Sequence, residues 1–341
     1  MRIPKLLAPV NSFESAVRVI RAGADEIYLG VGLPGGLKWF VLYRGPGTGG
    51  RGPTYDELGW IVDFAHKNNV KVILVVNEPF MSETLERPMR EHIRMCLDKG
   101  IDALIIGDIG VLSIVKDIGV DIPLYASTYF VSMNSEAVDF LREQGFSRVI
   151  LERHLTIQEI SEIVKQSKVD IEVFCHSGGC SNINGSCYFY HWGFQKFKRA
   201  IRKLKVFTSP CTIPFEVYDW ADPEKKIGIS PILDALTICS ICHLSALVET
   251  GVAGLKLVGR LEDVTTQEAS TRVYRKLLDL IGDSQLRHDK LKKMIKSSRQ
   301  EFEEVYSPLM APLTFSEACC RPKRCIFSPL LNAPYKVPVR A

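Results

Sequence analysis

Long apolar runs and an excess of one charge are both missing from this chain of 341 residues. No stretch of about 18 apolar residues occurs, so the sequence predicts no membrane-spanning helix. The first residues, MRIPKLLAPV, contain an apolar stretch that is too short for a signal peptide and that leads into a strand pattern. We therefore expect a cytoplasmic protein. The net charge of +4 is small, and the basic residues that gather at 196–205 and 287–299 also fit solvated helix faces.

Several catalytic signatures are also absent. The chain has no G-x-S-x-G elbow and no H-E-x-x-H helix, which disfavours serine hydrolases and zinc metalloproteases. The glycine-rich stretch 33–53 has no P-loop pattern. Only Cys239 and Cys242 form a C-x2-C pair, whereas a zinc ribbon prefers two such pairs.

Short apolar runs alternate with helical patterns along the chain. The runs are rich in Val, Ile and Leu without strict alternation, as expected of parallel strands that are covered on both faces. They lie at 5–10, 26–31, 71–77, 103–107, 124–128, 148–151, 171–176 and 254–259. Eight such strands predict an α/β fold of the (β/α)8 barrel type, with a doubly wound sheet as the alternative.

The predicted barrel spans residues 1–285 and contains a long, cysteine-containing insertion at about 177–253, before the last strand. Residues 286–341 form a C-terminal helix and a cysteine-rich tail in this interpretation. Active sites of such barrels lie at the carboxyl ends of the strands. The thiol-rich stretch CHSGGCSNINGSC at 175–187 follows the seventh strand, so we expect it at the barrel mouth.

Ten cysteines in a reducing compartment indicate metal or redox chemistry more than disulfides. Cys180, Cys187, Cys211 and Cys239 are widely spread, as are the ligands of many iron–sulfur clusters. Spacing alone leaves a zinc site or incidental thiols open. Cys175 lies inside a strand and is expected to be a small buried hydrophobe.

Three stretches together resemble the peptidase U32 family, along nearly the whole chain. They are LLAPVNSFESAVRVIRAGADEIYLGVG at 6–32, HSGGCSNINGSC at 176–187 and GVAGLKLVGRLEDVTTQEASTRVYRKLLD at 251–279. The resemblance implies a [4Fe–4S] cluster held by Cys180, Cys187, Cys211 and Cys239, with Cys242 as the alternative to Cys239. Ser177, Tyr129 and Ser186 depart from the residues usual in that family.

In several members the resemblance implies oxygen-independent hydroxylation, with prephenate as the oxygen donor. The substrates implied are the ubiquinone ring, tRNA uridine and ribosomal RNA cytidine. The chain length is closer to the compact quinone-pathway type, so a small aromatic or quinone-like substrate is expected ahead of RNA. The alternatives are a U32-type peptidase and a non-catalytic, cluster-carrying subunit that requires a homologous partner.

The residues at the strand ends are the candidates for catalysis and substrate binding. The predicted catalytic residues are His176, Arg260 and Glu152, and the predicted substrate-binding residues are Asn77, Ser127, Thr128, Tyr129, Lys256 and Tyr28. A guanidinium at Arg260 could bind a carboxylate such as that of prephenate with two hydrogen bonds. A structural ion pair of Arg260 with Glu26 or Glu152, and a purely structural His176, remain alternatives.

The tail carries Cys319, Cys320 and Cys325 beside three cations in EACCRPKRC. Neighbouring positive charge lowers a thiol's pKa and favours reactivity or ligation. A solvated tail, a lid over the barrel mouth and a second metal site are the three interpretations.

Overall fold

A computed structural model of the chain describes residues 2–31, 52–77, 82–176, 182–187, 214–231, 239–260 and 262–283. Its central feature is a closed barrel of eight strands in the order β1-β10-β7-β6-β5-β4-β3-β2, and every neighbouring pair is parallel. The (β/α)8 prediction is therefore confirmed, and the doubly wound alternative is wrong because the sheet closes on itself.

The eight barrel strands coincide with the eight apolar runs of the sequence. They are β1 (Lys5–Pro9), β2 (Glu26–Leu29), β3 (Lys71–Val76), β4 (Ala103–Ile106), β5 (Leu124–Ala126), β6 (Arg148–Ile150), β7 (Asp170–His176) and β10 (Gly254–Leu257). The helices around them are α1 (Phe13–Arg21), α2 (Tyr55–Lys67), α3 (Glu83–Leu97), α4 (Ile109–Ile118), α5 (Ser135–Glu143), α6 (Ile157–Gln166), α9 (Leu244–Glu249) and α10 (Val264–Gly282).

Local sequence fixes where these helices begin. The Thr54 side chain accepts a hydrogen bond from the Glu57 backbone, and the Glu57 side chain accepts one from the Thr54 backbone, which completes a capping box at α2. Thr156 and Glu159 form the same motif at α6. Each cap satisfies backbone N–H groups that the first turn leaves without partners.

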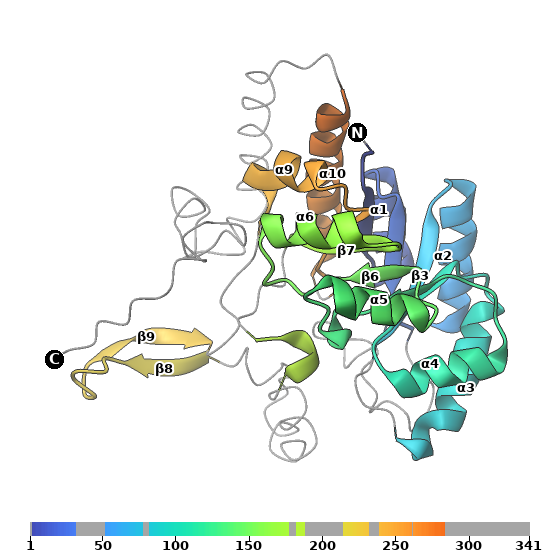
Figure 1. Cartoon of the computed structure of the whole chain (residues 1–341), viewed down its shortest axis with the longest axis horizontal. Coiled ribbons are helices and arrows are strands. Elements are labelled where there is room, and N and C mark those ends of the chain that lie inside the picture. Colours follow the sequence, from blue (N-terminus) through green and yellow to red (C-terminus); the bar gives the residue numbers. More distant parts are fainter. Residues whose placement is uncertain are drawn as a thin grey trace.

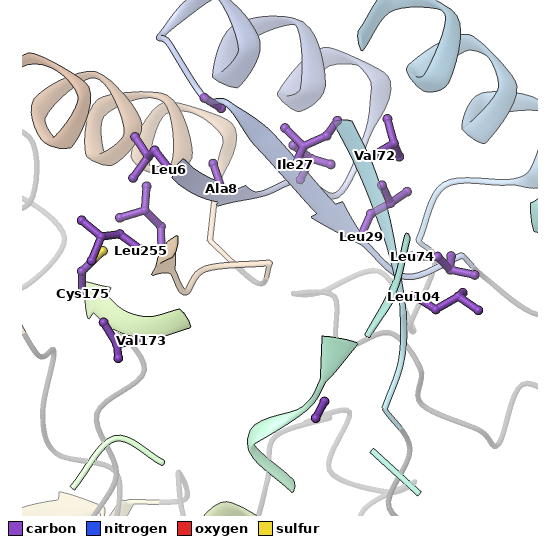
Figure 2. Packing of buried hydrophobic residues seen from close by; sticks show 14 of the residues in the cluster. Leu6, Ala8, Ile27, Leu29, Val72, Leu74, Leu104, Val173, Cys175 and Leu255 are labelled. Atoms are coloured by element: carbon purple, nitrogen blue, oxygen red, sulfur yellow. The ribbon is translucent and has the colours of Figure 1, made fainter. Parts of the chain in front are cut away.

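Each strand sends alternate side chains to the two faces of the barrel wall. One set packs between the strands and the surrounding helices; Leu6, Ile27, Val72 and Leu255 belong to it, and Figure 2 shows them together with Cys175, which lies near Leu255. Cys175 is fully buried in this layer, as the sequence predicted. The other set faces the barrel interior, and its apolar members are Leu7, Tyr28, Ile73, Val75, Ala103, Ile105, Tyr125, Ile150 and Phe174.

The predicted insertion contains regular structure that the sequence did not indicate. An antiparallel hairpin joins β8 (Pro214–Tyr218) to β9 (Lys226–Pro231), and Figure 1 shows it set apart from the barrel. Across the described ranges, no helix combines the length and apolar character needed to cross a bilayer. Most of the glycine-rich stretch 33–53, up to residue 51, and the tail from residue 284, with Cys319, Cys320 and Cys325, lie outside the described residues.

Candidate active site

Polar side chains gather where β3, β5 and β6 end. The Asn77 amide donates to the Ser127 hydroxyl at 3.3 Å, and the Thr128 hydroxyl donates to the Glu152 carboxylate at 2.9 Å. Ser127, Thr128 and Glu152 are buried, with exposures of 1%, 7% and 2%. Four predicted site residues from three strands are thus brought together at the carboxyl end of the barrel, where the fold places active sites.

Glu152 is held as a carboxylate by its neighbours. Its Oε1 lies 3.2 Å from His154 Nδ1 and 3.7 Å from Arg153 Nε. Burial acts to raise the pKa of Glu152, but hydrogen bonds from His154 and Thr128 and the charge of Arg153 outweigh it, so the net shift is downward. An ionised carboxylate at this position can accept hydrogen bonds or take up a proton from a substrate.

The segment 182–187, from the thiol-rich stretch, packs directly on this polar group. The Asn184 backbone N–H donates to Glu152 Oε2 at 3.4 Å, and its side-chain amide donates to the Thr128 hydroxyl at 3.4 Å. Gly185 lies so close to the Tyr129 carbonyl that any Cβ at this position would overlap it. Cys187 follows this 3-10 turn and is half-buried, which places one predicted metal ligand beside the ends of β5 and β6.

Cys239 reaches the barrel mouth from the other end of the insertion. It forms an antiparallel bridge with His176, the last residue of β7, and it is 7% exposed. His176 is 1% exposed, and its ring centroid lies 5.5 Å from that of Tyr274. Burial lowers the pKa of His176 to about 3, so the imidazole is neutral at physiological pH.

A buried charged group occupies the barrel interior. Arg148 donates from Nη1 to Glu26 Oε2 at 2.5 Å, from Nη2 to Glu26 Oε1 at 3.1 Å and from Nη1 to Glu172 Oε2 at 3.0 Å. Its guanidinium carbon also lies 4.2 Å from the centroid of the Tyr125 ring. Glu26 was considered as a partner of Arg260; the structure shows it bound by Arg148 on both carboxylate oxygens.

Lys256 extends this group toward the mouth. Its Nζ lies 3.4 Å from Glu172 Oε1 and 3.7 Å from the centroid of the Tyr28 ring. Burial lowers the pKa of Lys256 to about 8; the Glu172 carboxylate opposes this shift and the Arg260 guanidinium adds to it. Tyr28 itself is buried and donates to the Leu257 carbonyl at 2.8 Å. These contacts place Tyr28 and Lys256 within the barrel, below the predicted substrate position.

Arg260 follows β10 in a turn that other elements hold in place. Gly259 has φ +149°, a region that favours glycine, and its carbonyl accepts from Gln267 Nε2 at 2.7 Å. The Asn11 amide donates to the Arg260 carbonyl at 3.1 Å. The Arg260 guanidinium carbon lies 5.7 Å from the centroid of the Tyr28 ring, so the cation is close to the upper part of the barrel interior.

The predicted ligand set is described only in part. Cys187 and Cys239 are described, whereas Cys180 and Cys211 lie outside the described residues, as does the side chain of Cys242. Within the described ranges, no group of three or more His, Cys, Asp or Glu side chains could hold a metal ion. The two described thiols stand at the barrel mouth, on segments next to β5, β6 and β7, and this donor chemistry fits a group held by thiolates.

Sequence reasoning missed several residues that shape this site. Asn184 lies inside the thiol-rich stretch, and nothing in its local sequence indicates that its amide contacts Thr128. Glu26, Arg148 and Glu172 carry a recognisable signal, because a charged residue within a buried strand requires a partner of opposite charge. Tyr274 carries no signal in its local sequence, since its hydrogen bonds join segments that are distant along the chain.

The chain is similar in sequence to one protein family and to several known proteins. The sequence model of peptidase family U32 matches residues 11–311. The "23S rRNA 5-hydroxycytidine C2501 synthase" of Escherichia coli is 29% identical over 81% of this chain and 39% of its own length. An "Uncharacterized protease MJ0090" of Methanocaldococcus jannaschii is 27% identical over 90% of this chain and 72% of its own. The "tRNA hydroxylation protein P1" of Bacillus subtilis is 24% identical over 81% of this chain and 63% of its own.

Among solved structures, "The Structure of the U32 Peptidase Mk0906" aligns with a TM-score of 0.48 and 13% identity, covering 76% of this chain and 94% of that chain.

The matched region covers only about two fifths of the Escherichia coli relative, at 39% of its length. Parts of that protein have no counterpart in the matched region.

Proposed function

The chain belongs to peptidase family U32, and we propose that it is a hydroxylase that modifies a base of RNA. The observation that carries the proposal is the similarity, over 81% of this chain, to proteins named for hydroxylation of ribosomal RNA and of tRNA. Chain length had favoured a small quinone-like substrate. The named relatives favour RNA instead, and the small aromatic substrate stays an untested prediction.

The cofactor that we propose is a [4Fe–4S] cluster bound by Cys180, Cys187, Cys211 and Cys239. Two of these thiols are described: Cys239 forms a backbone bridge with His176, and the segment of Cys187 donates from the Asn184 N–H to the Glu152 carboxylate. When bound, such a cluster supplies one-electron redox chemistry next to the substrate position. With the cluster bound, segments 182–187 and 239–243 would line that site.

The chain's own residues would bind and orient the substrates. The Glu152 carboxylate is buried, ionised and hydrogen-bonded to Thr128, so it can accept an N–H or O–H of a base and fix its orientation. Arg260 supplies a cation near the mouth that suits an anionic oxygen donor, and prephenate has the required carboxylates. Asn77 and Ser127 offer further hydrogen-bonding groups at the same rim.

A peptidase function is the rival, because one relative is named as a protease. In the sequence, Cys180 and His176 are a thiol–imidazole pair beside the end of β7, and a catalytic pair of this kind would need an accessible base. His176 is 1% exposed and packs against Tyr274, which hinders its approach to a peptide bond. This burial favours a structural His176 over the catalytic role predicted for it.

The test is a comparison of RNA nucleosides from anaerobic cells that lack the gene with those from cells that carry it. Digested ribosomal RNA and tRNA are analysed by mass spectrometry, with a Cys239→Ser variant as the matched control. We expect one nucleoside heavier by a single oxygen atom in cells with the wild-type protein, and its loss in the other two strains. Identical nucleoside profiles in all three strains would refute RNA hydroxylation.

A further inference from the structure

Tyr274 lies in the middle of α10, and its phenol reaches the junction between β7 and the segment that carries Cys239. The side chain is fully buried. Its hydroxyl donates to the Cys175 carbonyl at 2.6 Å and accepts from the Ser240 backbone N–H at 3.2 Å. The Ser240 hydroxyl lies 3.3 Å from the same oxygen. One phenol therefore joins three elements of the fold.

These contacts act on the residues next to two predicted site residues. The phenol forms its hydrogen bonds with Cys175, which precedes His176, and with Ser240, which follows Cys239. The Ser240 N–H also donates directly to the Cys175 carbonyl at 3.1 Å. The Tyr274 phenol, which comes from α10, thus holds the backbone on both sides of the bridge between His176 and Cys239.

Core packing alone does not require a hydroxyl here. A phenylalanine would fill nearly the same volume, yet a buried hydroxyl is stable only when its hydrogen bonds are satisfied. The arrangement fixes backbone position at the start of a segment that is otherwise short and irregular: Cys239 and Ser240 lead straight into the 3-10 turn Ile241–His243. The orientation of the Cys239 thiol depends on that backbone position.

We propose that Tyr274 is a positioning residue that ties the Cys239 segment to the end of β7 and so holds the Cys239 thiol in the ligand set, in preference to Cys242. The proposal rests on the proposed cluster, but the tie itself is a property of the polypeptide. It acts through the backbone of Ser240 and Cys175 and touches no substrate. Partners of this kind behind metal ligands commonly change metal affinity on the order of 10- to 100-fold when they are removed.

The first experiment uses the metal-free protein, which separates the tie from the cofactor. Cys239 alkylation by iodoacetamide is followed by peptide mass spectrometry in wild type, Tyr274→Phe and Leu277→Ala. Leu277 is fully buried three residues along the same helix and tests general loss of packing. We expect faster alkylation of Cys239 in Tyr274→Phe alone. Equal rates in wild type and Tyr274→Phe, or equal acceleration in both variants, would overturn the proposal.

The second experiment uses anaerobically prepared protein that carries its cluster. We expect Tyr274→Phe to lose iron to a chelator about 10-fold faster than wild type and to show a changed electron paramagnetic resonance signal after reduction. Leu277→Ala should match wild type in both. If Tyr274→Phe retains the wild-type signal and rate, the positioning role is wrong. A wild-type protein without iron and sulfide would refute the cofactor proposal, and the alkylation result would still decide the tie.

Discussion

Replacing Arg148 by methionine should strongly destabilise the barrel. The guanidinium is 5% exposed and contacts Glu26 and Glu172, which are 3% and 0% exposed. Lys256 also contacts Glu172, so the group has two carboxylates and two cations. Arg148→Met keeps much of the side-chain volume but leaves two buried carboxylates with one cation.

The expected loss is about 3–5 kcal/mol, the usual cost of removing one partner from a buried ion pair. That is a large part of a typical stability of about 5–15 kcal/mol. It corresponds to a fall of roughly 5–8 °C in the melting temperature for a domain of this size. Thermal unfolding followed by far-ultraviolet circular dichroism measures the change.

A double variant sharpens this test. Arg148→Met with Glu26→Gln leaves Glu172 and Lys256 as a balanced pair, 3.4 Å apart. Because one uncompensated charge is then gone, the double variant should be more stable than Arg148→Met alone. A loss below about 1 kcal/mol in the single variant would show that the pair is weak, as exposed pairs are. A double variant no more stable than the single one would contradict the charge-balance argument.

Three further outcomes are expected. Burial lowers the pKa of Lys256 to about 8, below its value in the unfolded chain, so the folded protein loses this proton at a lower pH than the unfolded chain does. The free energy of unfolding should therefore rise as pH increases from 8 to about 10. Urea unfolding should show this rise in wild type but not in Lys256→Met. Gly185→Ala should displace its segment from Tyr129 and lower iron content, whereas Gly228→Ala, with open space around it, should retain iron; equal iron in both would contradict the close approach. Arg260→Ala should keep its iron and lose the modified nucleoside, and a normal nucleoside level would assign Arg260 a structural role.

The sequence predicted the barrel well because its strands carry a local signal. Runs such as KVILVV in β3 and ALII in β4 are apolar on both faces, and only a sheet covered on both sides requires this. The hairpin of β8 and β9 was missed although Ile227 and Ile229 alternate with small or polar residues in β9, because this short run lacks the continuous apolar character of the barrel strands.

Prediction of the site was less complete, for a physical reason. Strand ends converge in a barrel, so Asn77, Ser127, Thr128 and Glu152 could be grouped from their positions alone. The pairing of Arg148 with Glu26, by contrast, joins residues that are 122 positions apart across the barrel interior. Only the closed sheet brings them together, and no local pattern encodes which partner each charge finds.

Iron and sulfide analysis of anaerobically purified protein decides whether the chain binds the cluster, which the proposed reaction requires. We expect about four irons and four sulfides per chain, as a cubane held by four thiolates requires. Single changes of Cys180, Cys187, Cys211 or Cys239 to serine should abolish or sharply lower that content, whereas Cys96→Ser, at a buried thiol in α3, should leave it unchanged. A colourless protein with one tightly bound zinc and no sulfide would contradict the account.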